Sequence, residues 1–284
     1  MNPCSAFIAA VSLVWVSFPG SSAAGDLALT DISHIHGISF DAVKFGSVLL
    51  ATHYGVYRAK PDRTVETVSE DANDYMGFSS DPGNFGRLLA SGHPGQGGNL
   101  GVIASTDGGA TWTKISDGAG GPVDFHTISV SLADPKVIYG LFNGIQVSRD
   151  GGAGWTLVGP SPAQVIDLAA SAIDRDRVYA GTMAGLMRSV DGGFSWSLIG
   201  PSGRAATMVE ATVEGSLYAF FAGAGLYRFA KESSWQLLAT DFGERHILHL
   251  AANPTDPQHL VAVTEENALI ESRDGGTTWQ RFAE

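Results

Sequence analysis

The chain has 284 residues and a formal net charge of −12, from 17 Lys+Arg against 29 Asp+Glu. Nucleic acids and anionic membrane surfaces both select basic proteins, so this balance argues against either as a partner. The 36 glycines and the short apolar runs favour many tight turns between strands over long helices.

The N-terminal segment has the pattern of an export signal. Residues 1–24 carry no charged side chain, residues 6–18 are mostly apolar, and small side chains at 22–24 offer a cleavage site. The apolar run is too short for a membrane span. We therefore expect residues 1–24 to be a signal peptide and residues 25–284 to be a single exported domain, periplasmic or secreted. Cys4 is the only cysteine and falls in the signal segment, so no disulfide is expected.

Beyond the signal segment, short apolar runs alternate with turns rich in Gly, Pro and Asp. Six units can be written, each opening with two predicted strands, which we name A and B. The expected A strands are His36–Phe40, Met76–Ser79, His126–Val130, Asp167–Ala170, Met208–Val213 and His249–Ala252. The expected B strands are Val48–Thr52, Leu88–Ser91, Val137–Leu141, Val178–Gly181, Leu217–Phe221 and Leu260–Val263.

A repeated octapeptide, Ser-x-Asp-Gly-Gly-x-x-Trp, sets the period of these units. It occurs at 105–112, 148–155, 189–196 and 272–279. The step between the last two copies is twice as long as the other steps, and it contains a degenerate copy ending at Trp235. Strand-rich repeats with periods in the low forties are typical of β-propellers, with one four-stranded blade per repeat. We therefore predict an all-β, six-bladed β-propeller.

The octapeptide has the composition of a tight turn between the third and fourth strands of a blade, C and D. The two glycines supply positive φ angles, the Asp accepts hydrogen bonds from turn amides, and the Trp covers the turn. One carboxylate per turn provides too few oxygen ligands for calcium. We expect a structural role for the four box aspartates, Asp107, Asp150, Asp191 and Asp274.

The four octapeptides resemble those of the Asp-box, or bacterial-neuraminidase-repeat, proteins, in which the box is structural and lies away from the active centre. The phrases at 34–37, 52–55, 91–95 and 124–126 resemble one exported bacterial subgroup in particular. Its members are labelled glycosyl-hydrolase-like or exo-sialidase-like, without a settled substrate. The resemblance implies the fold, but a fold does not carry a function with it.

Antiparallel connectivity places seven of the eight histidines on one face of the propeller. A-to-B and C-to-D turns emerge on the box face, whereas B-to-C turns and D-to-A connections emerge on the opposite face. Five histidines begin A strands and two end B strands, which puts all seven opposite the boxes: His34, His36, His126, His246, His249, His53 and His93. Only His259 falls on the box face.

The starts of the A strands also suggest a ring around the central channel. The six positions are His36, Met76, His126, Asp167, Met208 and His249. Their spacing is nearly constant, except for a longer step from Met76 to His126 that contains the Gly-rich insert at 92–101. The ends of the B strands add a shallower tier: His53, His93, Asn143, Met183 and Glu265.

Imidazole, thioether and carboxylate groups around one pocket are ligands for a transition metal, and methionine favours copper. The candidate metal ligands are His36, His126 and His249. Alternatively, such histidines only hydrogen-bond the backbone between blades, and methionine only fills gaps in the packing.

True sialidases hold the substrate carboxylate with three arginines and carry an Arg-Ile-Pro sequence, which this chain lacks. On the histidine-bearing face only Arg204 and Arg245 approach A strands. Glycoside hydrolysis requires two carboxyl groups at a defined separation. The candidates for the nucleophile and the acid/base of such a site are Asp167, Glu210, Glu265 and Tyr54.

We expect a non-catalytic binding or assembly propeller whose His/Met-lined pocket takes a small ligand, a metal or another exported protein. Copper or another transition metal is the expected cofactor, if there is one. Asp-box propellers that act as photosystem assembly factors are a precedent by analogy. The alternative is a glycoside hydrolase, exo-sialidase-like, acting on an unidentified glycan.

Overall fold

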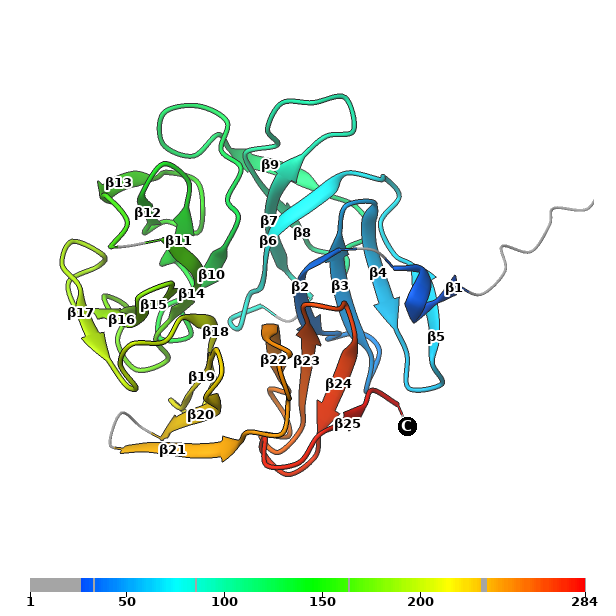
Figure 1. The fold of residues 1–284 in the computed structure, drawn as a ribbon. Helices are drawn as coiled ribbons and strands as arrows, with labels where there is room; N and C mark the ends of the chain where they lie inside the picture. The colour runs from blue at the N-terminus through cyan, green and yellow to red at the C-terminus, as the bar shows by residue number, and fades with distance from the viewer. Residues whose placement is uncertain (1–26, 33, 85, 163, 231–233, 284) are drawn as a thin grey trace, which may run out of the picture.

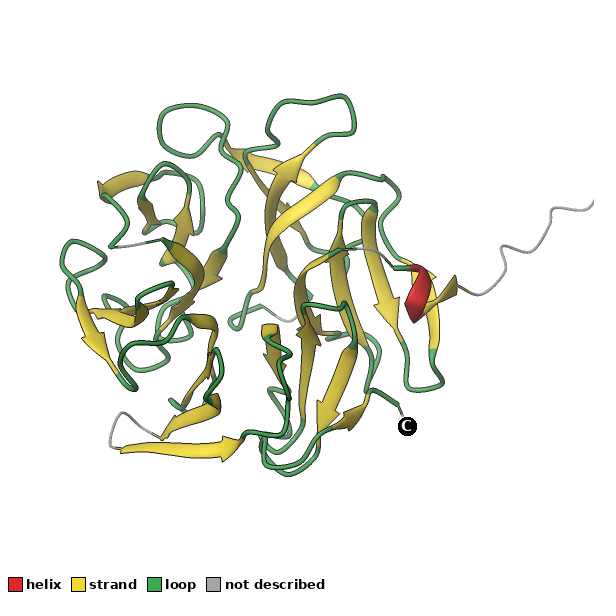
Figure 2. Cartoon of the chain, viewed as in Figure 1, coloured by secondary structure: helices red, strands yellow, loops and turns green. Residues whose placement is uncertain are grey.

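The computed structural model describes residues 27–283, except residues 33, 85, 163 and 231–233. The expected signal peptide, with Cys4, lies outside the described residues. In the described part, six antiparallel sheets stand around a central axis (Figures 1 and 2). The helical structure there is a single 3-10 turn, η1 (Leu29–Asp31). The predicted all-β, six-bladed propeller is confirmed. No described segment forms a helix long and apolar enough to cross a membrane.

Each blade is built from consecutive strands that pair in sequence order, with strand A nearest the axis (Figure 1). Blade 1 contains β2 (Ile35–Phe40), β3 (Val48–Thr52), β4 (Gly55–Ala59) and β5 (Thr64–Thr67). Blade 2 contains β6 (Asp74–Ser80), β7 (Leu88–His93), β8 (Val102–Ser105) and β9 (Thr113–Ser116). Blade 3 contains β10 (Ile128–Val130), β11 (Ile138–Leu141), β12 (Ile145–Ser148) and β13 (Thr156–Gly159).

The second half repeats this arrangement. Blade 4 contains β14 (Val165–Ala170), β15 (Val178–Thr182), β16 (Gly185–Ser189) and β17 (Ser197–Ile199). Blade 5 contains β18 (Ala206–Ala211), β19 (Leu217–Phe221), β20 (Gly225–Ala230) and β21 (Ser234–Ala239). Blade 6 contains β22 (Ile247–Ala252), β23 (Leu260–Thr264), β24 (Leu269–Ser272) and β25 (Gln280–Arg281). A short strand, β1 (Leu27–Ala28), pairs with β5 as a fifth strand of blade 1, which the sequence pattern did not suggest.

The repeated octapeptides form the turns between strands C and D. In the first, the Gly109 amide donates to Ser105 Oγ at 2.8 Å, and the Ser105 hydroxyl donates to Asp107 at 2.7 Å. The Trp112 indole N–H donates to the Gly109 carbonyl at 3.0 Å. Gly108 and Gly109 have φ angles of 73° and 95°, which a side chain rarely tolerates. The other three copies repeat these bonds and these positive φ angles.

Blade 5 replaces the missing octapeptide with aromatic stacking. Strand β20 pairs with β21, with Phe229 opposite Trp235. Their rings are stacked, with centroids 4.6 Å apart and planes 12° apart. The tryptophan of the degenerate copy therefore covers its hairpin through ring contact with strand C.

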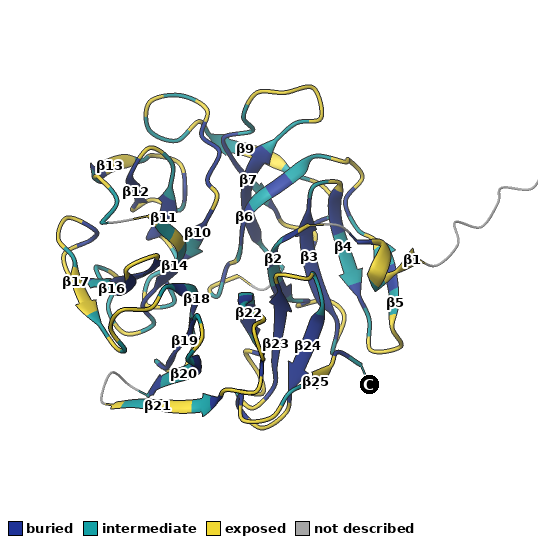
Figure 3. Ribbon diagram, viewed as in Figure 1, coloured by how far each residue is buried: buried dark blue, intermediate teal, exposed yellow. Residues whose placement is uncertain are grey.

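The B strands and the inner faces of the blades carry the buried core, which Figure 3 shows in dark blue. The apolar clusters join neighbouring blades, so that each blade covers the next. The cluster between blades 1 and 6 contains Val48 and Leu50 from one side and Val261 and Val263 from the other. Phe282, which follows β25, completes it. The ring is closed by packing between two complete blades, because every strand of blade 6 comes from the C-terminal segment.

The A strands β2, β6, β14, β18 and β22 each contain a β-bulge, and its position corrects the predicted register of the channel ring. In β2 the pairing with β3 jumps from Ile35 to Gly37, so His36 is the bulged residue. The bulged residues in β14, β18 and β22 are Ile166, Thr207 and Leu248.

The amides that close the A-to-B turns belong to Asp41, Asp81, Ser131, Ser171, Thr212 and Asn253, and they confirm this alignment. The true equivalents of His36 are therefore Met76, His126, Ile166, Thr207 and Leu248. The expected ring members Asp167, Met208 and His249 lie one position further along their strands. The reason is that the step from blade 3 to blade 4, between His126 and Ile166, is shorter by one position than the expected spacing.

Candidate functional site

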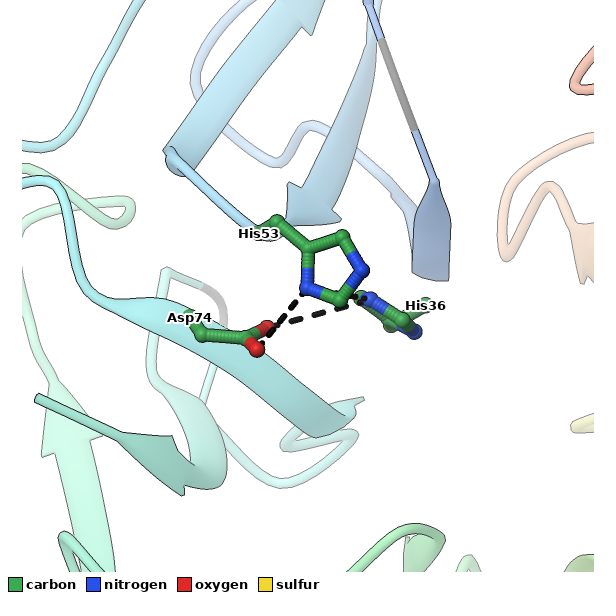
Figure 4. Close-up of side chains that lie close together, drawn as sticks. All are labelled: His36, His53 and Asp74. Carbon is green, nitrogen blue, oxygen red and sulfur yellow. Dashed lines mark hydrogen bonds and ion pairs between the residues drawn. The ribbon is translucent and has the colours of Figure 1, made fainter. Parts of the chain in front are cut away.

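The histidine face, which we define as the end of the propeller opposite the octapeptide turns, carries two clusters of His and Asp side chains. The first joins His36 of β2, His53 of the turn between β3 and β4, and Asp74 at the start of β6 (Figure 4). His53 Nδ1 lies 2.8 Å from Asp74 Oδ2 and 3.2 Å from His36 Nε2. His36 Nε2 lies 3.7 Å from Asp74 Oδ1. Ligand atoms of all three residues lie within 4.8 Å of one another.

The first cluster has fewer N–H donors than its acceptor atoms require. His53 Nδ1 is the donor to the carboxylate, so the lone pair of His36 Nε2 faces the same N–H. Asp74 Oδ1 is buried and has no hydrogen-bond partner. Buried polar atoms are rarely left unpaired, so this oxygen is a position where a water molecule or a cation can bind.

Burial and the neighbouring charge of His53 lower the pKa of His36 to about 4, although Asp74 acts in the opposite direction. At neutral pH the His36 imidazole is therefore uncharged, the form in which histidine binds metals. His34 lies beside the cluster, with its ring centroid 5.0 Å from that of His53 and a φ of 46°.

The second cluster is centred on Asp124, just before β10. One carboxylate oxygen, Oδ2, lies 2.9 Å from His93 Nε2 and 3.0 Å from His126 Nε2. The other oxygen, Oδ1, is buried without a hydrogen-bond partner. The second ring nitrogen of His93, Nδ1, lies 2.9 Å from the Gly98 carbonyl, and this contact is the largest cause of the raised pKa of His93.

The central channel behind these clusters is a cavity of about 100 Å³, and three further predicted residues line it: His249, Asp167 and Glu210. His249 lines it, and burial lowers the pKa of this histidine to about 4. His36, His126 and His249 thus share one channel, but the close contacts of His36 and His126 are with the two aspartates.

Asp167 and Glu210 also line the channel. Asp167 accepts hydrogen bonds from the amides of Leu168 and Val209 and from the Thr127 hydroxyl. It therefore ties blades 3, 4 and 5 together. Burial raises the pKa of Asp167 to about 6. Burial and the charge of Asp167 raise the pKa of Glu210 well above its ordinary value.

The predicted methionines take other places. Met208 is fully buried in the apolar cluster between blades 5 and 6, away from the channel. Met183 is 58% exposed in the turn between β15 and β16. Met76 is half-buried in β6, two residues after Asp74. Asn143 has a φ of 56° in the turn between β11 and β12, as the shape of that turn demands.

The remaining candidates do not join the clusters. Glu265 holds His246, accepting from its backbone amide, with His246 Nδ1 3.4 Å from the carboxylate. Tyr54 is 64% exposed beside His53. Arg204 and Arg245 each donate to a backbone carbonyl, of Ala222 and Phe242 respectively, and so do not converge on a shared anion site.

His259, expected on the box face, has a structural environment. Its Nε2 lies 3.1 Å from Glu271, and both side chains are almost fully buried. The box aspartates accept hydrogen bonds from the turn amides four residues later, as at Thr111, Gly154, Ser195 and Thr278.

Sequence reasoning missed the two carboxylates that organise the clusters, Asp74 and Asp124. Each lies seven residues before the residue that closes the next A-to-B turn, Asp81 or Ser131. Asp124 belongs to the family-like segment at 124–126, and Asp74 has the same position relative to the turn of its own blade. Aligning the units on their turns would have paired the two aspartates.

A larger cavity of about 320 Å³ opens at the other end of the channel, among the A-to-B turns. Apolar side chains dominate its rim, including Val43 and Phe45, which is 92% exposed. Its lining includes Asp41 and Asp81, each of which is paired with an arginine of its own blade. The His and Asp side chains that could bind a ligand together lie on the histidine face. The candidate functional site is therefore assigned to that face, although the cavity there is smaller than the one among the A-to-B turns.

No family model and no curated protein matches the chain. Among solved structures, a GH74 enzyme from Niastella koreensis aligns with 90% of this chain and 46% of its own, at 19% identity and a TM-score of 0.64. A YCF48 structure, bound to a D1 peptide, aligns with 88% and 82% of the two chains, at 18% identity and a TM-score of 0.55. A gluconolactonase from Xanthomonas campestris aligns with 86% and 88%, at 14% identity and a TM-score of 0.66.

The chain spans about half the length of the GH74 enzymes or less. At these identities the likeness concerns the fold alone. Hydrolases, a peptide-bound protein and a lactonase have this architecture in common, so what distinguishes the chain is the chemistry of its own histidine face.

Proposed function

We propose that this protein is a non-catalytic binding propeller whose histidine face holds a transition metal ion between His36, His53 and Asp74. The observation that carries the proposal is the approach of two imidazole nitrogens and a carboxylate to within 4.8 Å of one another. One of the carboxylate oxygens, Asp74 Oδ1, is buried and accepts no hydrogen bond from the protein, and His36 Nε2 lies 3.7 Å from it. A cation at this point would satisfy it and would replace the proton that His53 shares with the carboxylate.

The donor set favours a divalent ion of the later first-row metals. Imidazole and carboxylate ligands suit Zn²⁺ and Cu²⁺, and Cu²⁺ stands highest in the general affinity order. A preference for Cu(I) requires the Met76 thioether as a further ligand, and it stays a prediction. His36 would enter the site without losing a proton at neutral pH, because its pKa is about 4.

The alternative interpretation, that the cluster is only a hydrogen-bond network between blades 1 and 2, leaves Asp74 Oδ1 without a hydrogen bond from the protein, although His36 Nε2 lies 3.7 Å away. In that interpretation, the single proton on His53 Nδ1 must serve two acceptors, Asp74 Oδ2 and His36 Nε2. The two interpretations make opposite predictions for metal titration.

Calorimetric titration of the untagged protein with Cu²⁺ and with Zn²⁺ tests the proposal. His53→Ala should weaken binding by more than about 100-fold, since loss of an outer-sphere partner alone costs about 10- to 100-fold. His246→Ala is the matched control, because His246 also lies beside a carboxylate and its side chain is 38% exposed against 37% for His53. Absence of saturable binding in the wild type, or equal affinities in the two variants, would refute the metal site.

A glycoside hydrolase remains the second candidate, because Asp167 and Glu210 share the channel and both have raised pKa values. Resemblance to GH74 enzymes in fold is consistent with it. Against it, the carboxylate of Asp167 is occupied by two backbone amides and a hydroxyl. The channel cavity of about 100 Å³ is also smaller than usual ligand pockets, which begin at about 300 Å³. Turnover of an aryl glycoside that is lost in Glu210→Gln would favour this candidate.

A further inference from the structure

We propose that the histidine face holds a second metal ion, bound between His93, Asp124 and His126, so that the protein carries two ions at adjacent blade junctions. This inference rests on the proposed function of the first cluster and extends it. The hydrogen bonding of His93 and the equivalence of the two clusters in the propeller repeat support it.

The hydrogen bonding of His93 favours a cation between its Nε2 and the carboxylate of Asp124. A backbone carbonyl can only accept, so the contact of His93 Nδ1 with Gly98 O, at 2.9 Å, fixes the proton on Nδ1. In the neutral ring, Nε2 then carries a lone pair, yet it lies 2.9 Å from Asp124 Oδ2. Two lone pairs at this distance repel unless a second proton or a metal ion lies between them. A hydrogen bond from Nδ1–H to a backbone carbonyl is also one of the usual ways in which a metal-binding histidine is oriented.

Asp124 is suited to the same role. Its side chain is only 5% exposed, and its Oδ1 is buried without a partner. His126 completes the set, with Nε2 3.0 Å from Oδ2 and 63% of its side chain exposed. The exposed ring is free to adjust around an ion, whereas the carboxylate is held in place by burial.

The two clusters occupy equivalent positions in the repeat. Thr52 pairs with Ile35 as Gly92 pairs with Tyr75, so the following residues, His53 and His93, correspond. Asp74 and Asp124 correspond because both lie seven residues before the residue closing the next turn. Each site therefore combines a histidine from the end of strand B, or from the turn just after it, with an aspartate from the next blade.

The third ligand comes from a different side in each cluster. His36 belongs to the same blade as His53, whereas His126 belongs to the same blade as Asp124. Met76, the equivalent of both in blade 2, lies in the strand between the two sites. Asp74 pairs with His93 across β6 and β7, so the two clusters are direct neighbours.

The second site is the more open of the two. The ligand atoms of the first lie within 4.8 Å of one another, and no second group among the described residues does so. The His126 ring, 63% exposed, would have to turn towards His93 before all three residues could hold one ion. We therefore expect the ion at His36, His53 and Asp74 to bind first and the second ion to bind more weakly.

The stoichiometry of Cu²⁺ binding tests this inference, by calorimetric titration and by metal analysis after gel filtration of the untagged protein. The wild type should bind two ions per chain in two steps. His126→Ala should lose the weaker step and keep the tighter one, and His53→Ala should lose the tighter one. His126 is exposed, so its replacement leaves the fold intact, and a melting scan of each variant checks this. His246→Ala should keep both steps.

The outcomes separate the two proposals. A wild type that binds one ion, lost in His53→Ala and kept in His126→Ala, would refute the second site and support the first. Two ions that both persist in His126→Ala and in His93→Ala would also refute it. A wild type that binds no ion refutes both proposals together.

Discussion

Asp167 and Glu210 face the same channel but differ in how their charges are compensated. Asp167 accepts three hydrogen bonds, whereas burial and the charge of Asp167 act on Glu210 without an opposing donor. Both folded pKa values are raised, so folding favours the protonated forms. The stabilisation is complete below the unfolded pKa, which is about 4 for a carboxyl group, and is lost as pH rises through the folded pKa.

Glu210→Gln removes this titration without changing the side-chain volume. The variant should be more stable than the wild type at pH 8, and the difference should vanish towards pH 4. Glu265→Gln is the opposite case, because partial burial of Glu265 is outweighed by hydrogen bonds from His246, which lower its pKa. It should be less stable than the wild type at pH 8. Urea unfolding at the two pH values measures both, and equal shifts would contradict the assigned environments.

The sequence predicted the face on which seven histidines lie, because the strand connectivity determines it. It did not predict the carboxylates that these histidines contact. A histidine at the end of strand B was recognisable from connectivity alone. That His53 meets Asp74 depends on how far the turn of blade 1 reaches over blade 2, which no local pattern records. Met208 shows the converse, because one residue of register decides between the channel and the apolar cluster.

The octapeptide turn is the element that sequence predicted most completely, since its residues satisfy one another locally. The copies still differ in how many donors the aspartate holds. Asp274 accepts from the Ser272 and Thr278 hydroxyls and from the Thr277 and Thr278 amides. Asp150 has a glycine at the position of Thr278, so no hydroxyl reaches it from that side.

Asp274→Ala should therefore cost more than Asp150→Ala. We expect about 1 kcal/mol for Asp274→Ala, the lower part of the usual range for lost hydrogen bonds, because the turn is exposed to water. Chemical unfolding of the two variants measures the difference. Binding of Cu²⁺ should be unchanged in both, since the boxes lie on the opposite face. A larger loss in Asp150→Ala would contradict the role of the hydroxyl donors.

The A-strand bulge is the element that sequence misjudged. Spacing alone cannot distinguish a bulge from a longer turn, because both add one residue to the unit. The step from blade 3 to blade 4 is shorter by one position than the steps that follow it, so a ring drawn at equal spacing slips from Asp167 onward. The error moved three expected ring members by one position, while the blade count was unaffected.

At the scale of the whole molecule, the ring must be closed between its first and last blades. Propellers gain stability when each blade covers the next, so the junction of blades 1 and 6 has to be as well packed as the others. The Ile35 amide donates to Asn267 Oδ1, and Arg63 donates to the carbonyl of Ala283. Phe282 packs into the cluster that contains Val48 of blade 1 and Val261 of blade 6.

Phe282→Ala should open this junction and destabilise the whole propeller. The side chain is 4% exposed, and truncation of a buried phenylalanine costs about 3–5 kcal/mol through lost burial and the cavity that remains. Phe194→Ala is the matched control, since this ring is 65% exposed in a box turn and should change stability by less than about 0.5 kcal/mol. Unfolding should remain a single transition in the control. A loss in Phe282→Ala no larger than in Phe194→Ala would mean that the ring does not depend on this contact for closure.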